Sequence, residues 1–346
     1  MNSATERVLL AHGDGGLLTA KLVDEVFLKN LGGQAAGGLL DAAILDGRGR
    51  GGSRGGRRRL ALTTDSFVVK PVFFPGGDIG SLAVHGTVND LASVGACPLA
   101  LSAAFILEEG LEVAVLQRVV ASMGKAAARV GVPIVTGDTK VVEKGAADGL
   151  FINTTGLGEI LPAADLSFGR LRPGDRVLVS GSVGDHGVAV LSQRKGLAFE
   201  TPVISDSAPL FDLVRPLLER APGVKFLRDP TRGGLATTLK EIAASAGEVD
   251  IVIEEDRIPV RPAVAGACEI LGLDPLYLAN EGKIIVVVEE SGAAEALRIL
   301  RGHPLGADAA EVGRVEAGRG DLWLVTSLGG TKRLDRLTGE QLPRIC

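Results

Sequence analysis

The 346-residue chain is predicted to be a two-domain α/β (α+β) protein with a C-terminal tail. Segments of strand character alternate with helical patterns along most of its length. The length exceeds the roughly 250–300 residues at which a single hydrophobic core stops growing. A hydrophobic fraction of 46% and a charged fraction of 23% are typical of a globular protein. We therefore expect two packed domains rather than a disordered chain.

Hydrophobic periodicity and β-branched residues mark the elements of the first half of the chain. The clearest amphipathic helix is the one that ends at Gly131 and Pro133, both of which are helix-ending residues. The predicted elements, in order, are a strand over 59–69, a helix over 81–95, a strand over 99–109, a helix over 111–132, and strands over 133–142 and 150–160.

The second half repeats the alternation after a boundary near residues 161–172. Its predicted elements are a strand within 171–181, a helix over 235–247, and strands over 249–255 and 283–290. Residues from 333 onward have little apolar periodicity, which is typical of a tail. The predicted organisation is therefore a first domain over 1–160, a second over 161–332, and a mobile tail over 333–346.

Charge and hydropathy exclude some classes of function. A net charge of −5 argues against a general nucleic-acid-binding protein, although residues 47–59 contain six arginines and no acid. That stretch is either an RNA- or partner-binding arm or a flexible loop, and the absence of aromatic residues within it favours the loop. No apolar run reaches the roughly 18 residues that cross a bilayer, and the N-terminus lacks a signal-peptide pattern. We expect a cytoplasmic protein without a membrane partner.

The three cysteines are too few and too scattered for a disulfide framework or a zinc site. Cys97 and Cys268 lie in apolar text and are expected to be small buried residues. Cys346 is the last residue, after Pro343, in a tail that could reach roughly 45 Å at about 3.4 Å per residue. This thiol is either a covalent carrier on a movable arm or a terminal cysteine without a role.

Acidic residues stand in turns at the ends of the predicted strands. They are Asp65, Asp90, Asp138 and Asp229. Mg²⁺ is usually held by one or two carboxylates together with phosphate oxygens, and separated aspartates of this kind suit it. Each of them could instead be a helix cap or turn former. Four in similar contexts leave both interpretations open.

Glycine-rich turns over 11–16, 74–80, 180–187 and 230–234 could cradle phosphate groups. Neither a P-loop nor a strand-embedded GxGxxG is present, so ATP would have to bind by another scheme. His12 and His186 lie in these turns, and both a structural role and a role in a site are open for them. Structural roles are favoured for His85 and His303.

Two charged residues, Lys140 and Glu281, interrupt apolar strand text. A charged side chain beside buried strands must be paired or functional. A structural salt bridge is the simpler interpretation of either, although their shared placement beside a glycine and a strand is also consistent with a role in a site.

Together these segments resemble the HypE family of carbamoyl dehydratases, which mature hydrogenases, and more widely the superfamily of aminoimidazole ribonucleotide synthetase. The resemblance runs from about residue 8 to the last residue and leaves out the arginine/glycine stretch. The matching text is LAHGDGG, TTDSFVVKPVFFPGGDIGSLAVHGTVNDLASVGACP, FILEEGL, IVTGDTKVVEKGAADGLFINTTGLGEI, SGSVGDHG, LRDPTRGG, LANEGK and PRIC.

The resemblance implies an N-terminal domain that dimerises through its strands, a C-terminal α/β domain, and ATP between them. It implies that Asp65, Asp90 and Asp229 hold Mg²⁺ against the triphosphate. The loop with His12 and Gly13 is implied to close over the phosphates. Further implied nucleotide contacts are Asn89, Thr136, Gly137 and Asp138.

The chemistry implied by the resemblance is ATP-dependent dehydration of an S-carbamoyl group on Cys346 to a thiocyanate, which supplies cyanide ligands to the iron of NiFe hydrogenase. Glu281 is implied as the base and Lys140 as its orienting or proton-handling partner. The implied protein partners are a HypF-like carbamoyltransferase that loads Cys346 and a HypC–HypD-like scaffold that receives the cyanide. The alternatives are a related synthetase that acts on a free amide and a nucleotide-sensing scaffold without catalysis.

Overall fold

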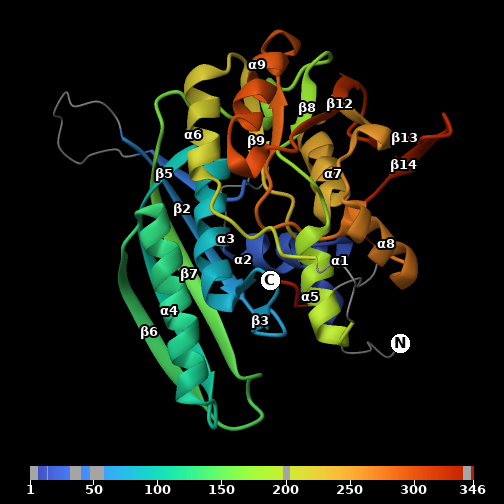
Figure 1. The fold of residues 1–346 in the computed structure, drawn as a ribbon. Coiled ribbons are helices and arrows are strands. Elements are labelled where there is room, and N and C mark those ends of the chain that lie inside the picture. Colours follow the sequence, from blue (N-terminus) through green and yellow to red (C-terminus); the bar gives the residue numbers. More distant parts are fainter. Residues whose placement is uncertain (1–6, 14, 32–39, 47–57, 198–202, 338–343) are drawn as a thin grey trace, which may run out of the picture.

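The computed structural model describes residues 7–13, 15–31, 40–46, 58–197, 203–337 and 344–346. They form two mixed sheets, each with helices packed on it, and the α/β class expected from the sequence is confirmed (Figure 1). Among the described helices, none combines the length and hydropathy that crossing a bilayer requires.

The N-terminal sheet has five strands, with β5 and β6 parallel and the other neighbours antiparallel. Helices α3 (Ile79–Ser93) and α4 (Val113–Val130) lie along one face of it (Figure 1). Across the sheet the strands are β1 (Ala43–Asp46), β2 (Arg59–Phe67), β7 (Leu150–Ile160), β5 (Ala96–Glu108) and β6 (Ile134–Val142). A small hairpin of β3 (Phe73–Phe74) and β4 (Gly77–Asp78) precedes α3.

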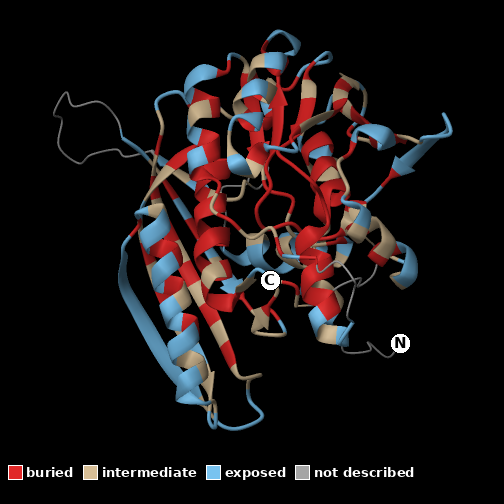
Figure 2. Cartoon of the chain, in the orientation of Figure 1, coloured by how far each residue is buried: buried red, intermediate tan, exposed pale blue. Residues whose placement is uncertain are grey.

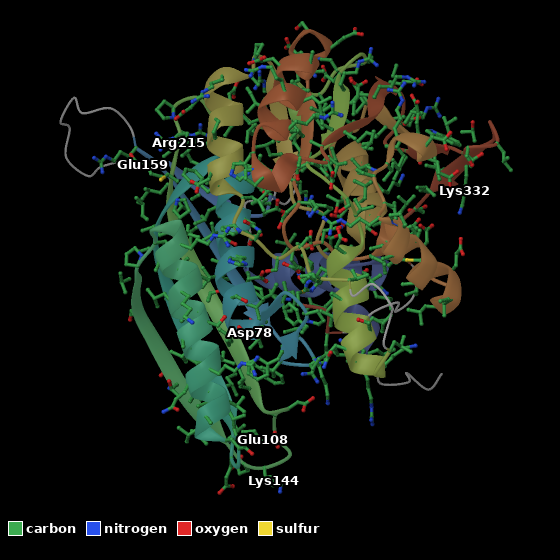
Figure 3. All side chains as sticks on the ribbon, in the orientation of Figure 1. Asp78, Glu108, Lys144, Glu159, Arg215 and Lys332 are labelled. Atoms are coloured by element: carbon green, nitrogen blue, oxygen red, sulfur yellow. The ribbon has the colours of Figure 1, made fainter. Side chains whose placement is uncertain are left out.

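Helix α3 is the central element of the first domain. Asp78 stands just before the first residue of this helix (Figure 3). Its side chain accepts hydrogen bonds from the backbone N–H groups of Gly80 and Ser81, and Ser81 completes a capping box. A Cβ on Gly80 would stand 2.3 Å from the Val119 carbonyl oxygen, so glycine lets α4 approach. Almost every residue of α3 is buried, because the sheet, α4 and the second domain surround it (Figure 2).

The second sheet has seven strands and only β10 and β13 run parallel. Its strands in spatial order are β14 (Thr331–Leu334), β13 (Leu322–Val325), β10 (Val249–Glu254), β12 (Ala310–Ala317), β8 (Arg176–Val179), β11 (Ile285–Val288) and β9 (Val224–Arg228). Its helices are α5 (Asp185–Lys195), α6 (Phe211–Arg220), α7 (Gly234–Ala246), α8 (Pro262–Leu271) and α9 (Glu290–Arg301).

Short helices complete the fold. The N-terminal ones are η1 (Leu10–Gly13), α1 (Leu17–Leu22), η2 (Val23–Leu28) and α2 (Lys29–Leu31), and the others are η3 (Phe168–Arg170), η4 (Glu255–Arg257), η5 (Pro275–Tyr277) and η6 (Pro304–Gly306). The Leu17 N–H donates to the Leu337 carbonyl oxygen, so the N-terminal helices lie against the chain that follows β14.

The two domains share one hydrophobic core. Apolar side chains from α3 and α4 join those of α6, α9 and one face of the second sheet in a single cluster, and α7 covers the opposite face. Each predicted strand and helix has a counterpart within a few residues, and Cys268 is buried as expected, whereas Cys97 is only half-buried. Strand β14 ends at Leu334 and thus crosses the expected start of the tail at residue 333.

Candidate functional site

A cavity of about 520 Å³ lies where the two domains meet, under the N-terminal helices. Acidic side chains from both domains line it, together with three arginines and the terminal residue. Its charged lining residues are Asp24, Asp41, Asp65, Asp90, Arg228, Asp229, Arg232, Glu241, Glu281 and Arg336, and Cys346 is also part of the wall. A smaller cavity of about 70 Å³ adjoins it and shares Arg232 and Cys346.

Four acids named from the sequence converge on the larger cavity from different elements. Asp65 projects from β2 and Asp90 from α3, while Asp229 follows β9 and Glu281 precedes β11. The Thr63 hydroxyl donates to Asp90 Oδ2 at 2.7 Å, which orients that carboxyl group. Segments up to about 200 residues apart in the chain therefore build one acidic wall.

Burial raises the pKa of each of these four carboxyl groups. The pKa of Asp90 lies well above its ordinary value because of burial, and Asp229 and Asp65 add repulsion. Burial, with repulsion from Asp41, raises the pKa of Asp229 to about 8. The pKa of Glu281 is also raised well above its usual range, first by burial and then by Asp229. Such a cluster favours protons or a cation in the cavity.

Glu281 is held rigidly from both sides. The Asp206 carboxylate accepts hydrogen bonds from the backbone N–H groups of Glu281 and Gly282, each at 3.2 Å, and pairs with Lys283 at 3.0 Å. A Cβ on Gly282 would stand 1.8 Å from the Asp206 carbonyl oxygen, so this position requires glycine. Glu281 Oε1 is buried without a hydrogen-bond partner among the described residues. The carboxyl group is therefore placed in the cavity with one oxygen available.

Asn89 does not line the cavity but braces it. Its side-chain amide donates to the carbonyl oxygens of Ala208 and Glu281, at 3.0 and 3.2 Å. Its oxygen accepts from the Leu210 N–H at 2.8 Å. Because both ends of the fully buried amide are used inside the protein, Asn89 links α3 to the loop that carries Glu281.

Several cavity residues were missed by the sequence reasoning. Arg228 pairs with Asp41 at 3.1 Å and with Glu241 on α7 at 3.1 Å. The arginines on either side of Asp229, at 228 and 232, stand in the text LRDPTRGG, which was itself a signal. Asp41 and Glu241 carried no local signal, because one precedes an ordinary strand and the other lies on an ordinary amphipathic helix.

Arg232 stands between the acids and the terminal thiol. Its pKa is raised first by the electrostatic interaction with Cys346 and further by Asp65, against the effect of burial. The turn after it has left-handed backbone at Gly233 and Gly234, with φ of +76° and +62°. A Cβ on Gly234 would stand 2.5 Å from the Leu278 carbonyl oxygen. The two glycines thus let the chain turn sharply and point Arg232 into the cavity.

The terminal residues 344–346 lie inside the molecule. The Val68 N–H donates to an oxygen of the terminal carboxylate of Cys346 at 3.0 Å, and the Lys70 N–H donates to the Arg344 carbonyl oxygen at 3.2 Å. Ile345 is buried in the shared core. Burial raises the pKa of the Cys346 thiol to about 12, although Arg232 opposes the shift. The thiol therefore lies protonated against the acidic cavity.

Other residues named from the sequence lie away from the cavity of this chain. Thr136, Gly137, Asp138 and Lys140 all belong to β6, whose residues are exposed, and the Lys140 ammonium contacts Asp138 at 2.5 and 2.7 Å (Figure 2). His12 is in η1, where its ring Nδ1 lies 3.0 Å from the Leu9 nitrogen. These placements leave the roles expected for the β6 residues and for His12 as predictions.

Gly13 lies beside the thiol rather than in the acidic wall. It lines the smaller cavity, and its carbonyl oxygen accepts from Arg232 at 3.5 Å. The loop expected to close over phosphates therefore stands next to the arginine that both cavities share.

The acidic side chains of the cavity suit a divalent cation that is also bound by oxygen atoms of a ligand. Within the ranges that the structure describes, no group of three or more His, Cys, Asp or Glu side chains forms a ready metal site. The buried carboxyl groups of Asp90 and Asp229 nevertheless repel each other. An ion bound through one or two of them and through phosphate oxygens would relieve that repulsion.

Raised carboxyl pKa values make the stability of the unliganded protein depend on pH. The folded chain keeps protons that the unfolded chain releases, so stability should fall as pH rises from about 4 to about 8, the pKa of Asp229. Asp229→Asn should remove part of that slope and raise stability at pH 8 by on the order of 1–3 kcal/mol. Thermal unfolding at pH 5 and pH 8 measures this change.

Asp250 is the control, because its pKa is shifted in the opposite direction, below the ordinary value. Backbone N–H groups and Trp323 hold the pKa of Asp250 below its ordinary value against its partial burial. Asp250→Asn should therefore destabilise the protein at pH 8. If Asp229→Asn lowers stability at pH 8 as Asp250→Asn does, the charge repulsion argued for the cavity is wrong.

Comparison with known proteins places this geometry in a family. Residues 40–160 match the family described as AIR synthase related protein, N-terminal domain, and residues 172–324 match the corresponding C-terminal domain. A protein of Cupriavidus necator named carbamoyl dehydratase HypE is 51% identical, over 100% of this chain and 97% of the relative.

Two solved structures share the fold. One, described as hydrogenase maturation protein HypE in complex with ATP, is 52% identical with a TM-score of 0.80 and covers 98% of this chain and 100% of that one. Another, described as a HypE–HypF complex, is 48% identical with a TM-score of 0.85 and covers 91% and 99%. Both likenesses extend over nearly the whole of the chain described here.

Proposed function

Because the chain belongs to the HypE family of carbamoyl dehydratases, we propose that it uses ATP to dehydrate a carbamoyl group carried on its own Cys346, in the maturation of NiFe hydrogenase. One observation carries the proposal. The terminal thiol lies in the wall of the same cavity as Glu281 and the acids Asp65, Asp90 and Asp229. A similar structure is described as a complex with ATP, which supports ATP as the ligand of that cavity.

The proposed reaction converts Cys346–S–C(=O)–NH₂ to Cys346–S–C≡N. The carbamoyl oxygen attacks the γ-phosphorus of ATP, and ADP leaves. The C–O bond then breaks as phosphate departs, and the nitrogen loses both of its protons as the C≡N bond forms. The balance is one ATP consumed, one ADP and one phosphate released, and one water removed from the carbamoyl group. Phosphate replaces hydroxide as the leaving group, which makes the step feasible.

We assign Glu281 as the group that accepts a proton from the carbamoyl nitrogen. A carboxylate with a raised pKa is a better proton acceptor near neutral pH than an ordinary one. Its unpartnered Oε1 can receive an N–H without breaking an existing bond. Arg232 lowers the pKa of Glu281 and thereby favours its ionised form.

Asp65, Asp90 and Asp229 would hold Mg²⁺ in this scheme. Their buried and mutually repelling carboxyl groups fit a cation that is also bound by phosphate. When bound, the ion neutralises negative charge on the phosphate groups. Gly13 and His12 are proposed to approach the phosphates from the N-terminal loop.

We propose that two chains pair along β6 and that this pairing brings Lys140, with Thr136, Gly137 and Asp138, toward the partner's cavity. The support is the exposure of the strand, including apolar Val135 at 64% and Val141 at 68%. An exposed apolar edge strand of this length invites pairing with another chain. Lys140 would then orient the reacting group or handle its proton.

The pairing has a direct test in solution. Val135→Asp should convert a dimer to monomers, because it places a charge in the proposed contact. Sedimentation equilibrium measures the mass. Val120→Asp is the control, since Val120 is exposed on α4 rather than on β6. A dimer that withstands Val135→Asp, or a wild-type chain that sediments as a monomer, would contradict the proposal.

The proposed partners follow from the carrier chemistry. A HypF-like carbamoyltransferase would load Cys346, as the relative described in a HypE–HypF complex suggests. A HypC–HypD-like iron scaffold would receive the cyanide, since a thiocyanate must pass its carbon to an acceptor. We place the reaction in the cytoplasm, where thiols stay reduced, in keeping with three free cysteines. The proposal requires an ATP-dependent loss of one water from the carbamoylated C-terminal peptide.

A further inference from the structure

Helix α5 holds the terminal residues Arg344–Cys346, here called the C-terminal arm, at two points. The ring Nε2 of His186 lies 2.8 Å from the Ile345 carbonyl oxygen. Two turns further along the same helix, the Arg194 guanidinium donates to the Arg344 carbonyl oxygen at 2.7 Å. The two successive carbonyl groups that precede the terminal cysteine are therefore both bound by side chains of α5.

The hydrogen bonds around His186 define the direction of its bond to the arm. A carbonyl oxygen only accepts, so Nε2 must carry the hydrogen and donate it to Ile345. Nδ1 then accepts from the Ser205 hydroxyl, 2.8 Å away, whose oxygen accepts the Ser207 N–H at 3.1 Å. The edge-on ring of Phe74 closes another side, with 5.4 Å between ring centroids. Ser205 and Phe74 thus lock the imidazole in the orientation that serves the arm.

His186 has no contact with the reacting groups. It is fully buried and lines neither of the two cavities at the site. Burial lowers its pKa, so the ring is neutral near pH 7 and keeps the single Nε2–H that the arm uses. What the ring fixes is the Ile345 carbonyl group, and that group belongs to the peptide plane from which Cys346 extends. That plane and the bond from Val68 to the terminal carboxylate together fix the backbone of Cys346, which lines the cavity.

We propose that His186 is a positioning residue that seats the C-terminal arm and so places the sulfur of Cys346 in the reaction cavity. The inference rests on the proposed function, in which that sulfur carries the substrate. Arg194 supports the same seat at the preceding carbonyl group. Loss of His186 leaves the Ile345 carbonyl unpaired in a buried place, which shifts the arm toward the undocked state.

The reactivity of the Cys346 thiol reports docking without any enzymatic turnover. Docked, its pKa is about 12 and almost no thiolate is present. Undocked, a cysteine has its ordinary pKa of about 8.5 and reacts with iodoacetamide through the thiolate. The alkylation rate at Cys346, followed by peptide mass spectrometry without ATP or a carbamoyl donor, therefore measures the undocked fraction.

His85 offers a matched control. It is also a buried histidine, and its Nδ1 lies 3.0 Å from the Ser207 hydroxyl. Burial lowers the pKa of His85 to about 4, so it too is neutral. Its position on α3 gives it no hydrogen bond to the arm among the described residues. His85→Ala thus removes a comparable buried ring and its hydrogen bond to the Ser207 hydroxyl, whereas the chain that orients His186 uses the backbone N–H of Ser207.

We expect His186→Ala to raise the alkylation rate of Cys346 on the order of tenfold, as loss of one buried hydrogen bond predicts. His85→Ala should leave that rate near the wild-type value. His186→Gln keeps a side-chain N–H donor and should restore much of the protection. Cys268, which is buried elsewhere, should stay unreactive in all variants and reports that the fold is intact.

An unchanged rate in His186→Ala, or an equal rise in His85→Ala, overturns the proposal. If His186→Ala also makes Cys268 reactive, its fold is disturbed and His186→Gln becomes the test. A His186→Gln protein in which Cys268 stays unreactive but Cys346 is alkylated as fast as in His186→Ala also contradicts the proposal. None of these readouts depends on ATP turnover. If the alkylation rates come out as expected but the protein never dehydrates a carbamoyl group, only the proposed function is refuted, and the role of His186 in docking the arm stands.

Discussion

Replacing Cys346 by serine abolishes carbamoyl dehydration, because the sulfur is the atom that carries the substrate. The substitution changes one atom and leaves the backbone bond from Val68 to the terminal residue in place. The expected loss is the entire catalysed rate, about 10⁶-fold or more. The measurement is ADP formation in the presence of a carbamoyl-donor system.

The matched control is Cys97→Ser. Cys97 is half-buried on β5, away from both cavities of the site, and its replacement should leave ADP formation intact. ATP affinity should also survive in Cys346→Ser, since the charged wall of the cavity is unchanged. A Cys346→Ser protein that forms ADP at the wild-type rate would instead indicate a synthetase that acts on a free amide.

Replacing Glu281 by glutamine should lower the dehydration rate by about 10²–10⁴-fold, the range expected for loss of a general base. The S-carbamoyl form of Cys346 should then accumulate, because loading does not need this carboxyl group. Stability should not fall. Burial raises the pKa of Glu281, so a neutral amide of the same shape removes a charge that the folded state disfavours.

Glu241→Gln is the control for Glu281. Glu241 lines the same cavity, but its carboxylate is already paired with Arg228 at 3.1 Å. Its replacement should affect stability more than the rate of dehydration. Stopped-flow or quench-flow kinetics together with thermal unfolding separate the two outcomes. If Glu281→Gln keeps the wild-type rate, another group takes the proton.

Sequence patterns predict best the elements whose neighbouring residues alone indicate their secondary structure and burial. The helix over 111–132 was clear because its apolar period and its glycine end are local features, and α4 spans Val113–Val130. The fold brings Asp65, Asp90 and Asp229 to one cavity, but the turns expected for them are wrong for two of the three, since Asp65 lies in β2 and Asp90 within α3. Their shared role in Mg²⁺ binding was expected from the family resemblance and not from periodicity. Residues far apart in the chain give no sign in the sequence that they lie close together in space.

Other features depend on tertiary structure and had no local signal. Asp41 and Glu241 belong to the site only because Arg228 draws both toward the cavity. The docked position of the C-terminal arm was undecided from the sequence, because it depends on His186 across 159 residues of chain. Lys140 lies on an exposed strand of one chain, so its placement depends on an assembly that one sequence does not describe.

The central claim is that Cys346 carries the group that ATP helps to dehydrate. Peptide mass spectrometry after incubation with ATP, Mg²⁺ and a carbamoyl-donor system tests it most directly. The account predicts that the C-terminal peptide first gains a carbamoyl group and then, only when ATP is present, loses the mass of one water. A carbamoylated peptide whose mass stays constant while ADP accumulates would contradict it.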